Sequence, residues 1–115
     1  MLIHYPPQEG SFVEISPEDV QDALKSSTIR LIDVRGEDEW NTARIEGATL
    51  ASKTLVDEMM ASWDKDTPLV FYCHTGVRSL NAVQFFAQKG FTNVKSMAGG
   101  IDAWSLTIDP TVPRY

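Results

Sequence analysis

Short apolar runs alternate along the chain with longer segments in which apolar residues recur at helical spacing. The apolar runs are rich in β-branched and aromatic residues, which is typical of buried strands. They predict five strands, at residues 12–15, 29–34, 48–51, 68–72 and 93–97. The other segments predict a helix capped by Ser16, helices over 54–63 and 79–89, and one or two helical turns over 37–42.

The alternation of strands and helices indicates the fold class. Strands that follow one another through helices form right-handed βαβ units, which build a parallel sheet covered on both faces. We therefore predict one α/β domain over residues 12–107, with a central, mostly parallel five-stranded sheet and helices on both faces. Residues 1–11 are expected to form an irregular lead-in, and residues 108–115 an extended C-terminal tail.

Charge and cysteine content narrow the function classes. The net charge is −6, and the Lys and Arg residues are scattered, so neither nucleic acid nor an anionic membrane is an expected partner. A single cysteine excludes an internal disulfide and fits a reducing compartment. The N-terminal residues lack the pattern of a signal peptide, and no stretch approaches the roughly 20 apolar residues of a membrane span. We expect a cytoplasmic location.

The single cysteine, Cys73, stands where a predicted strand ends and a predicted helix begins. Ligands bind at this edge of a parallel sheet, and the start of a helix favours anions and lowers the pKa of a thiol. Gly76 allows the positive φ that closely packed loop amides need, and Arg78 adds a cation. Lone cysteines are more often inert core residues, but this placement predicts a nucleophile in an anion-holding loop.

Four segments resemble motifs of the rhodanese-like domain family, and they occur in the family's order. Together they cover roughly residues 12–104, and four motifs in order are far more specific than any one of them. They are Cys-His-Thr-Gly-Val-Arg-Ser at 73–79, Asp-Val-Arg at 33–35 with the acidic and aromatic residues that follow, Arg-Ile-Glu-Gly-Ala at 44–48, and Gly-Gly-Ile-Asp-Ala-Trp at 99–104.

The resemblance implies a single-domain sulfurtransferase of the thiosulfate type. Cys73 would take sulfane sulfur from a donor such as thiosulfate, hold it as a persulfide and pass it to a thiophilic acceptor such as cyanide or a thiol. The resemblance implies no metal and no organic cofactor. The expected substrate-binding residues are the rest of the loop, namely His74, Thr75, Gly76, Val77, Arg78 and Ser79. Ser79 is also a candidate helix cap.

Other interpretations of the chain remain open. A sulfur-relay or binding module would exchange sulfur with a sulfur-carrier or thiol protein and have little activity on small molecules. The segment 108–115 resembles the end of rhodanese modules attached to sulfur-carrier adenylating enzymes. Phosphatases and arsenate reductases of the wider superfamily carry five residues between cysteine and arginine, whereas this chain has four. The Gly99-Gly100 pair predicts a tight turn packed near the loop rather than a phosphate cradle.

Charged residues near the second predicted strand are candidates for support of the site. The resemblance suggests that Asp33 hydrogen-bonds around the site and that Arg35 pairs with an acidic residue such as Glu39. For Arg35 and Glu39 we favour a structural ion pair that caps the next helix, and for Asp33 both interpretations stay open. Arg44 and Ala43 replace the family's usual histidine and glycine, which we expect to affect local packing, or to place an extra cation near the site.

Overall fold

Five parallel strands form the central sheet in the computed structural model, which describes residues 13–115. Their order across the sheet is β1-β5-β4-β2-β3, and every pairing is parallel. The five predicted strands are confirmed, while the lead-in 1–11 and Phe12 lie outside the described residues. The strands are β1 (Glu14–Ile15), β2 (Arg30–Asp33), β3 (Thr49–Leu50), β4 (Leu69–Tyr72) and β5 (Val94–Met97).

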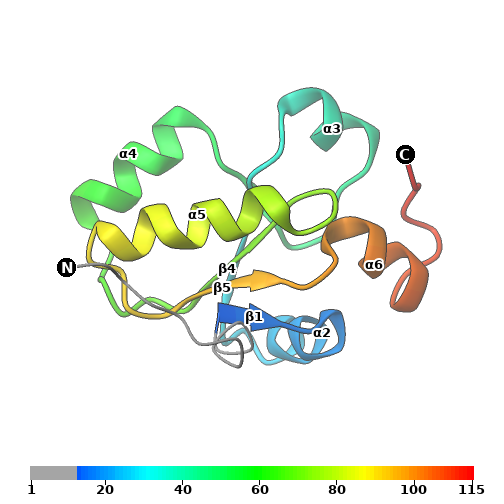
Figure 1. Ribbon diagram of the computed structural model, residues 1–115, viewed down its shortest axis with the longest axis horizontal. Coiled ribbons are helices and arrows are strands. Elements are labelled where there is room, and N and C mark those ends of the chain that lie inside the picture. Colours follow the sequence, from blue (N-terminus) through cyan, green and yellow to red (C-terminus); the bar gives the residue numbers. More distant parts are fainter. Residues whose placement is uncertain (1–12) are drawn as a thin grey trace.

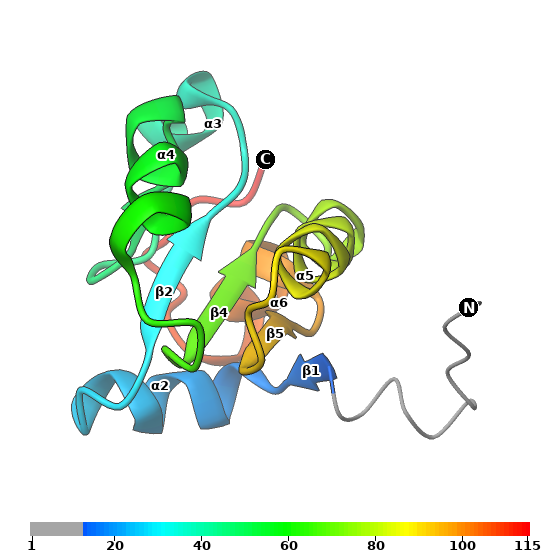
Figure 2. The same cartoon turned by 90° about the vertical axis from the view of Figure 1, so that its left-hand side faces the viewer.

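Helices cover both faces of this sheet, as predicted (Figures 1 and 2). Helices α2 and α6 bury Val20 and Trp104 against one face, and helices α4 and α5 bury Met59 and Phe86 against the other. No helix within residues 13–115 is long and apolar enough to cross a membrane. The helices are α2 (Pro17–Lys25), α3 (Glu37–Thr42), α4 (Lys53–Ser62), α5 (Val77–Gln88) and α6 (Gly100–Thr107).

The central strand β4 positions the site. All four of its residues are buried, because both faces of a parallel sheet are covered by helices. Its register pairs Tyr72, the last residue of β4, with Asp33, the last residue of β2. The segments that follow these two strands therefore begin side by side at the carboxyl edge of the sheet, where ligands of such sheets bind.

Helix α6 is the one helix within residues 13–115 that the apolar pattern did not predict. It begins at two glycines, Gly99 and Gly100, with φ angles of 73° and 62°. Glycine pairs usually indicate a turn, so the sequence signal for the helix was weak. The expected turn is present at Gly99 and Gly100, and helix α6 begins within it, at Gly100. The helix buries Trp104, which is 6% exposed.

The segment 108–115 differs from the extended tail that was expected. The Asp109 carboxylate accepts hydrogen bonds from the amide and hydroxyl of Thr111, at 3.0 and 2.6 Å, which closes a turn. Val112 follows this turn and is buried in the core cluster on the α2 and α6 face. The chain then returns across the carboxyl edge of the sheet and places Tyr115 beside the loop after β4.

Candidate active site

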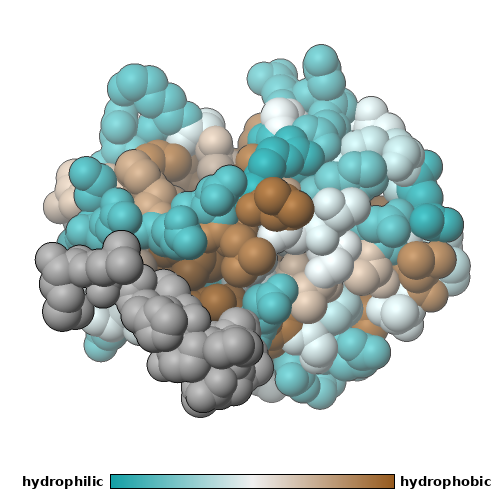
Figure 3. Space-filling view, viewed as in Figure 1, coloured by the Kyte–Doolittle hydropathy of each residue, from teal (hydrophilic) through white to brown (hydrophobic). Residues whose placement is uncertain are grey.

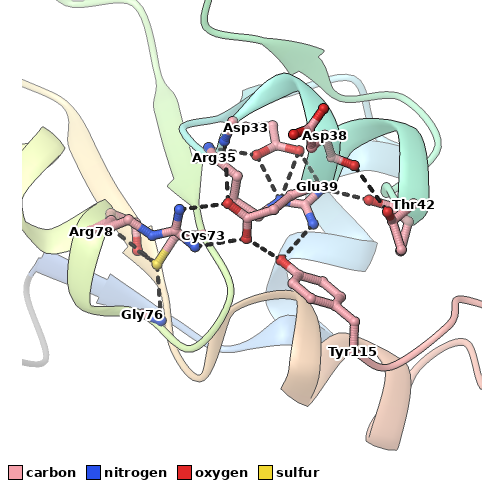
Figure 4. Close-up of polar contacts among 12 residues, drawn as sticks. Asp33, Arg35, Asp38, Glu39, Thr42, Cys73, Gly76, Arg78 and Tyr115 are labelled. Carbon is pink, nitrogen blue, oxygen red and sulfur yellow. Dashed lines mark hydrogen bonds and ion pairs between the residues drawn. The ribbon is translucent and has the colours of Figure 1, made fainter.

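The loop after β4 holds Cys73 at the junction that the sequence predicted. Cys73 follows the strand directly, the backbone turns at Gly76 with a φ of 109°, and helix α5 begins at Val77. The amide of Gly76 donates to the Cys73 sulfur at 3.1 Å (Figure 4). The amide of Ser79 donates to the same sulfur at 3.4 Å. The amide groups at the helix start therefore converge on the sulfur, as an anion-holding loop requires.

A hydroxyl group also contacts the sulfur. Ser79 Oγ lies 3.4 Å from Cys73 Sγ and 2.6 Å from Ser96 Oγ on β5, and both serines are fully buried. Ser79 is not the cap of helix α5, since Gly76 occupies that position. Its hydroxyl instead contacts the Cys73 sulfur. Ser96 was missed by the sequence analysis, because a serine inside a short strand carries no functional pattern.

The surroundings lower the pKa of Cys73. Burial alone raises this pKa, but the hydrogen bonds from the Ser79 hydroxyl and from the amides of Ser79, Gly76 and Thr75 outweigh burial. Hydrogen bonds to the charged form favour that form, so the thiolate becomes more populated than in a free cysteine. The hydrogen-bond donors in the loop and at the start of α5 are therefore the causes that lower this pKa.

Arg78 forms a bidentate ion pair with Glu39 of helix α3, with distances of 2.7 and 2.9 Å. The expected partner of Glu39 was Arg35, and that prediction was wrong. The Arg78 hydrogen bonds, helped by the Tyr115 hydroxyl, hold the pKa of Glu39 at about 2. Helix α3 is thereby tied to the first turn of α5, and Glu39 orients the Arg78 side chain next to the loop.

Arg35 pairs instead with Asp33, two residues before it. Both side chains are fully buried, and Arg35 Nε and Nη2 reach the two carboxylate oxygens at 2.6–3.1 Å. Arg35 also donates to the Ala43 carbonyl at 2.5 Å and to the Tyr115 hydroxyl at 2.8 Å. A buried ion pair is tolerated when its remaining donors are satisfied. Asp33 therefore orders the strand end beside the loop, and its hydrogen bonds go to Arg35 rather than to Cys73.

The two departures from the family's usual residues have a structural explanation. Ala43 supplies the carbonyl that accepts from the buried Arg35, which needs no side chain. The Arg44 guanidinium lies over the Trp40 ring, 4.8 Å from its centroid, in a cation–π contact. Both residues thus take part in the packing around helix α3.

Tyr115 joins these pairs to the loop. Its ring stacks on His74, with centroids 4.1 Å apart and planes 10° apart. Its hydroxyl accepts from Arg35 and donates to Glu39 at 2.5 Å. No sequence signal indicates a contact between residues so far apart in the chain. The result is one polar chain through Asp33, Arg35, Tyr115, Glu39 and Arg78 (Figure 4).

The start of helix α6 anchors the loop from the opposite side. The amide of Ile101 donates to the Cys73 carbonyl at 2.9 Å, and the amide of Asp102 donates to the His74 carbonyl at 3.1 Å. A methyl group on Gly100 would lie 2.5 Å from the Cys73 carbonyl oxygen, so the two segments touch backbone to backbone. The predicted packing of the glycine turn against the loop is confirmed.

Two further residues of the loop and the helix start are exposed to solvent. Thr75 and Val77 are exposed, and Val77 is 68% accessible. Phe85, farther along α5, is also exposed. Figure 3 shows apolar surface, in brown, in the region of the molecule where α5 lies in Figure 1. Among residues 13–115, no three His, Cys, Asp or Glu side chains come together as a metal site would need.

Comparisons with known proteins agree with this geometry. The family model of the rhodanese-like domain matches residues 16–107. The probable adenylyltransferase/sulfurtransferase MoeZ of Mycobacterium tuberculosis is 38% identical over 104 residues, which are 88% of this chain but only 26% of that protein. The thiosulfate sulfurtransferase GlpE of Actinobacillus succinogenes is 31% identical over 91% of this chain and 95% of its own length. The human single-domain sulfurtransferase TSTD1 is similar in structure, with a TM-score of 0.73, 24% identity and coverage of 83% of this chain and 96% of that one.

Proposed function

The chain belongs to the rhodanese-like domain family, and on that premise we propose that it moves sulfane sulfur from an anionic donor such as thiosulfate to a thiophilic acceptor through a persulfide on Cys73. One observation carries the proposal. The Cys73 sulfur lies in a loop whose amides and one hydroxyl converge on it and lower its pKa. The relatives named thiosulfate sulfurtransferase support the same reaction class.

The reaction follows from the chemistry of a stabilised thiolate. The Cys73 thiolate attacks the outer sulfur of thiosulfate, the sulfur–sulfur bond of the donor breaks, and sulfite leaves with the electron pair. The enzyme then carries a Cys73 persulfide anion. An acceptor such as cyanide attacks the terminal sulfur and leaves as thiocyanate, which restores the thiolate. Charge balances in both steps, and no metal, oxidant or reductant enters.

The loop donors have a role in both steps. The amides of Gly76 and Ser79 stabilise the Cys73 thiolate before attack and again when it is the leaving group. The exposed residue Thr75 contributes a third amide next to the sulfur. Only four residues separate Cys73 from Arg78, which favours a single sulfur over the larger tetrahedral group that a phosphatase loop encloses.

Arg78 is the proposed binding group for the negative charge of the donor. Its ion pair with Glu39 uses one N–H of Nη1 and one of Nη2. A guanidinium has five N–H groups, so three remain for an anion. Glu39 partly neutralises the cation, which fits a residue that orients a donor and releases sulfite afterwards.

A second candidate is a sulfur-relay module that exchanges sulfur with a thiol or sulfur-carrier protein. Two observations favour it. The match to MoeZ covers a quarter of that longer protein, which is named as an adenylyltransferase as well as a sulfurtransferase. The exposed apolar side chains of Val77 and Phe85 also lie on the helix that begins at the loop, where a protein acceptor would approach. The cytoplasm is the proposed location for either function.

Intact-mass analysis after thiosulfate treatment tests the proposal. We expect the wild-type protein to gain about 32 Da, one sulfur atom, and to lose it to cyanide with release of thiocyanate. Cys73→Ser should show neither step. Persulfide formation with negligible thiocyanate turnover would favour the relay module. Cys73-dependent release of phosphate from an aryl phosphate, without a mass gain, would overturn the sulfurtransferase assignment.

A further inference from the structure

Two buried hydroxyl groups form a chain beneath the Cys73 sulfur. Ser79 comes from the first turn of helix α5, and Ser96 comes from strand β5, on which that helix packs. Both are completely inaccessible to water. The oxygen–oxygen distance of 2.6 Å is that of a strong hydrogen bond, and Ser79 Oγ continues the chain to the sulfur at 3.4 Å.

The number of partners decides the direction of this chain. Within residues 13–115, the Ser96 hydroxyl has one hydrogen-bond partner, which is Ser79 Oγ. The Ser79 hydroxyl has two, which are Ser96 Oγ and Cys73 Sγ. Each serine hydroxyl has a single proton to donate. Buried donors that find no acceptor are strongly disfavoured.

Only one arrangement uses both protons. If Ser79 donated to Ser96, the Ser96 proton would have no acceptor in the described part of the chain. If Ser96 donates to Ser79, the Ser79 proton is free to point at Cys73 Sγ, and both donors are satisfied. The burial of Ser96 therefore sets the direction of the Ser79 hydroxyl, although Ser96 never touches the sulfur.

We propose that Ser96 is a positioning residue for the nucleophile, because its hydroxyl donates to Ser79 Oγ and so directs the Ser79 proton at the Cys73 sulfur. This inference rests on the proposed function in that it takes Cys73 to be the nucleophile. Without Ser96, the Ser79 hydroxyl could turn toward a backbone carbonyl of the preceding turn, as serines in helices do. With Ser96, the donor stays aimed at the sulfur, and the paired hydroxyls strengthen one another.

The test is the pH midpoint of Cys73 alkylation by iodoacetamide, which needs no sulfur donor. Ser79→Ala removes a direct hydrogen bond to the thiolate and should raise the midpoint by about one unit. Ser96→Ala should raise the midpoint by about 0.3–0.6 unit. Ser79 can still donate to the sulfur in this variant, but Ser96 no longer orients or strengthens that hydrogen bond. Ser105→Ala is the matched control, because Ser105 is also buried but donates to the Val112 carbonyl. It should leave the midpoint unchanged.

The double variant shows whether Ser96 acts through Ser79. In the Ser79→Ala background, Ser96→Ala should cause no further shift, and Ser96→Thr, which keeps a hydroxyl, should behave like the wild type in the native background. An unchanged midpoint in Ser96→Ala, or an equal shift with and without Ser79, overturns the proposal. The charged and titratable groups around the loop are the same in every variant, so they do not account for a difference in midpoint between variants. They are His74 in the loop, Arg78 on α5, Glu39 on α3, Asp102 on α6, and Tyr115.

The outcomes of this test and of the persulfide test are separate. A protein that accepts no sulfur from thiosulfate but shows the alkylation shifts has the hydroxyl chain and lacks the proposed function. A protein that forms the persulfide but shows no shift in Ser96→Ala has the function and lacks the positioning role.

Discussion

Gly100→Ala is expected to disturb the cysteine loop from a neighbouring segment. The added methyl group would lie 2.5 Å from the carbonyl oxygen of Cys73, and no real side chain tolerates a Cβ contact that short. The loop backbone must therefore move by roughly 1 Å to restore a van der Waals separation. This movement breaks or weakens the two hydrogen bonds by which α6 holds the loop, at 2.9 and 3.1 Å.

The expected loss of stability follows from these contacts. The left-handed conformation of Gly100, with a φ of 62°, costs an alanine about 1–2 kcal/mol. Losing two backbone hydrogen bonds adds about 1–3 kcal/mol. The total is about 2–5 kcal/mol, a large share of the roughly 5–15 kcal/mol that stabilises a typical domain. Displaced amides of Gly76 and Ser79 should also let the pKa of Cys73 rise toward that of a free thiol.

Gly90→Ala supplies the matched control. Gly90 also has a positive φ, 97°, but an added methyl group would meet nothing within 4 Å. A φ of 97° is farther from the left-handed region that alanine tolerates than a φ of 62°, so backbone strain alone makes Gly90→Ala the worse variant. The loop contact makes Gly100→Ala worse. Urea unfolding and the pH dependence of Cys73 alkylation measure the two effects. A milder loss of stability in Gly100→Ala than in Gly90→Ala, or an unchanged alkylation midpoint in Gly100→Ala, would contradict the expected clash with the loop.

Three further outcomes concern the polar chain beside the loop. Arg78→Ala should raise the KM for thiosulfate about tenfold, and Arg78→Lys should restore it only in part because the planar fork is lost. Steady-state kinetics that are unchanged in both variants would exclude this role. Glu39, with a pKa of about 2 in place of 4.5, contributes stability that is complete above about pH 4.5 and is lost as the pH falls toward 2. Glu39→Gln should remove that part of the acid-unfolding curve, and an identical curve would contradict the pairing. Tyr115→Phe, which keeps the ring on His74, should lower the unfolding free energy by about 1 kcal/mol in urea, and full stability would show that the hydroxyl links nothing.

The loop was predictable because its determinants are local. A strand, Cys73, a glycine and a helix start follow one another within a few residues, and each has a recognisable pattern. The direction of the shift in the Cys73 pKa followed from the same placement. Its main cause did not, because the Ser79 hydroxyl approaches the sulfur only once helix α5 begins at Val77, two residues earlier than the apolar pattern indicated.

The partner of each arginine was not predictable, because it depends on how distant elements meet. Arg35 and Arg78 were both available to Glu39, and the resemblance to the family favoured Arg35. In the fold, helix α3 carries Glu39 over the start of α5, while Arg35 turns inward to Asp33. The return of Tyr115 to the loop likewise depends on the turn at Asp109 and the burial of Val112. No local pattern in the segment 108–115 indicates that return.

The position of Tyr115 has a practical consequence for recombinant work. Its ring lies flat on His74, so any tag or fusion partner joined directly after Tyr115 would begin at the mouth of the cysteine loop. A tethered segment is present at its attachment point at an effective concentration in the millimolar range. A polyhistidine tag placed there would obstruct the approach of a donor to the loop or screen the thiol from an acceptor. Kinetic constants measured on a protein with a tag directly after Tyr115 would therefore include the effect of the tag on access to the loop.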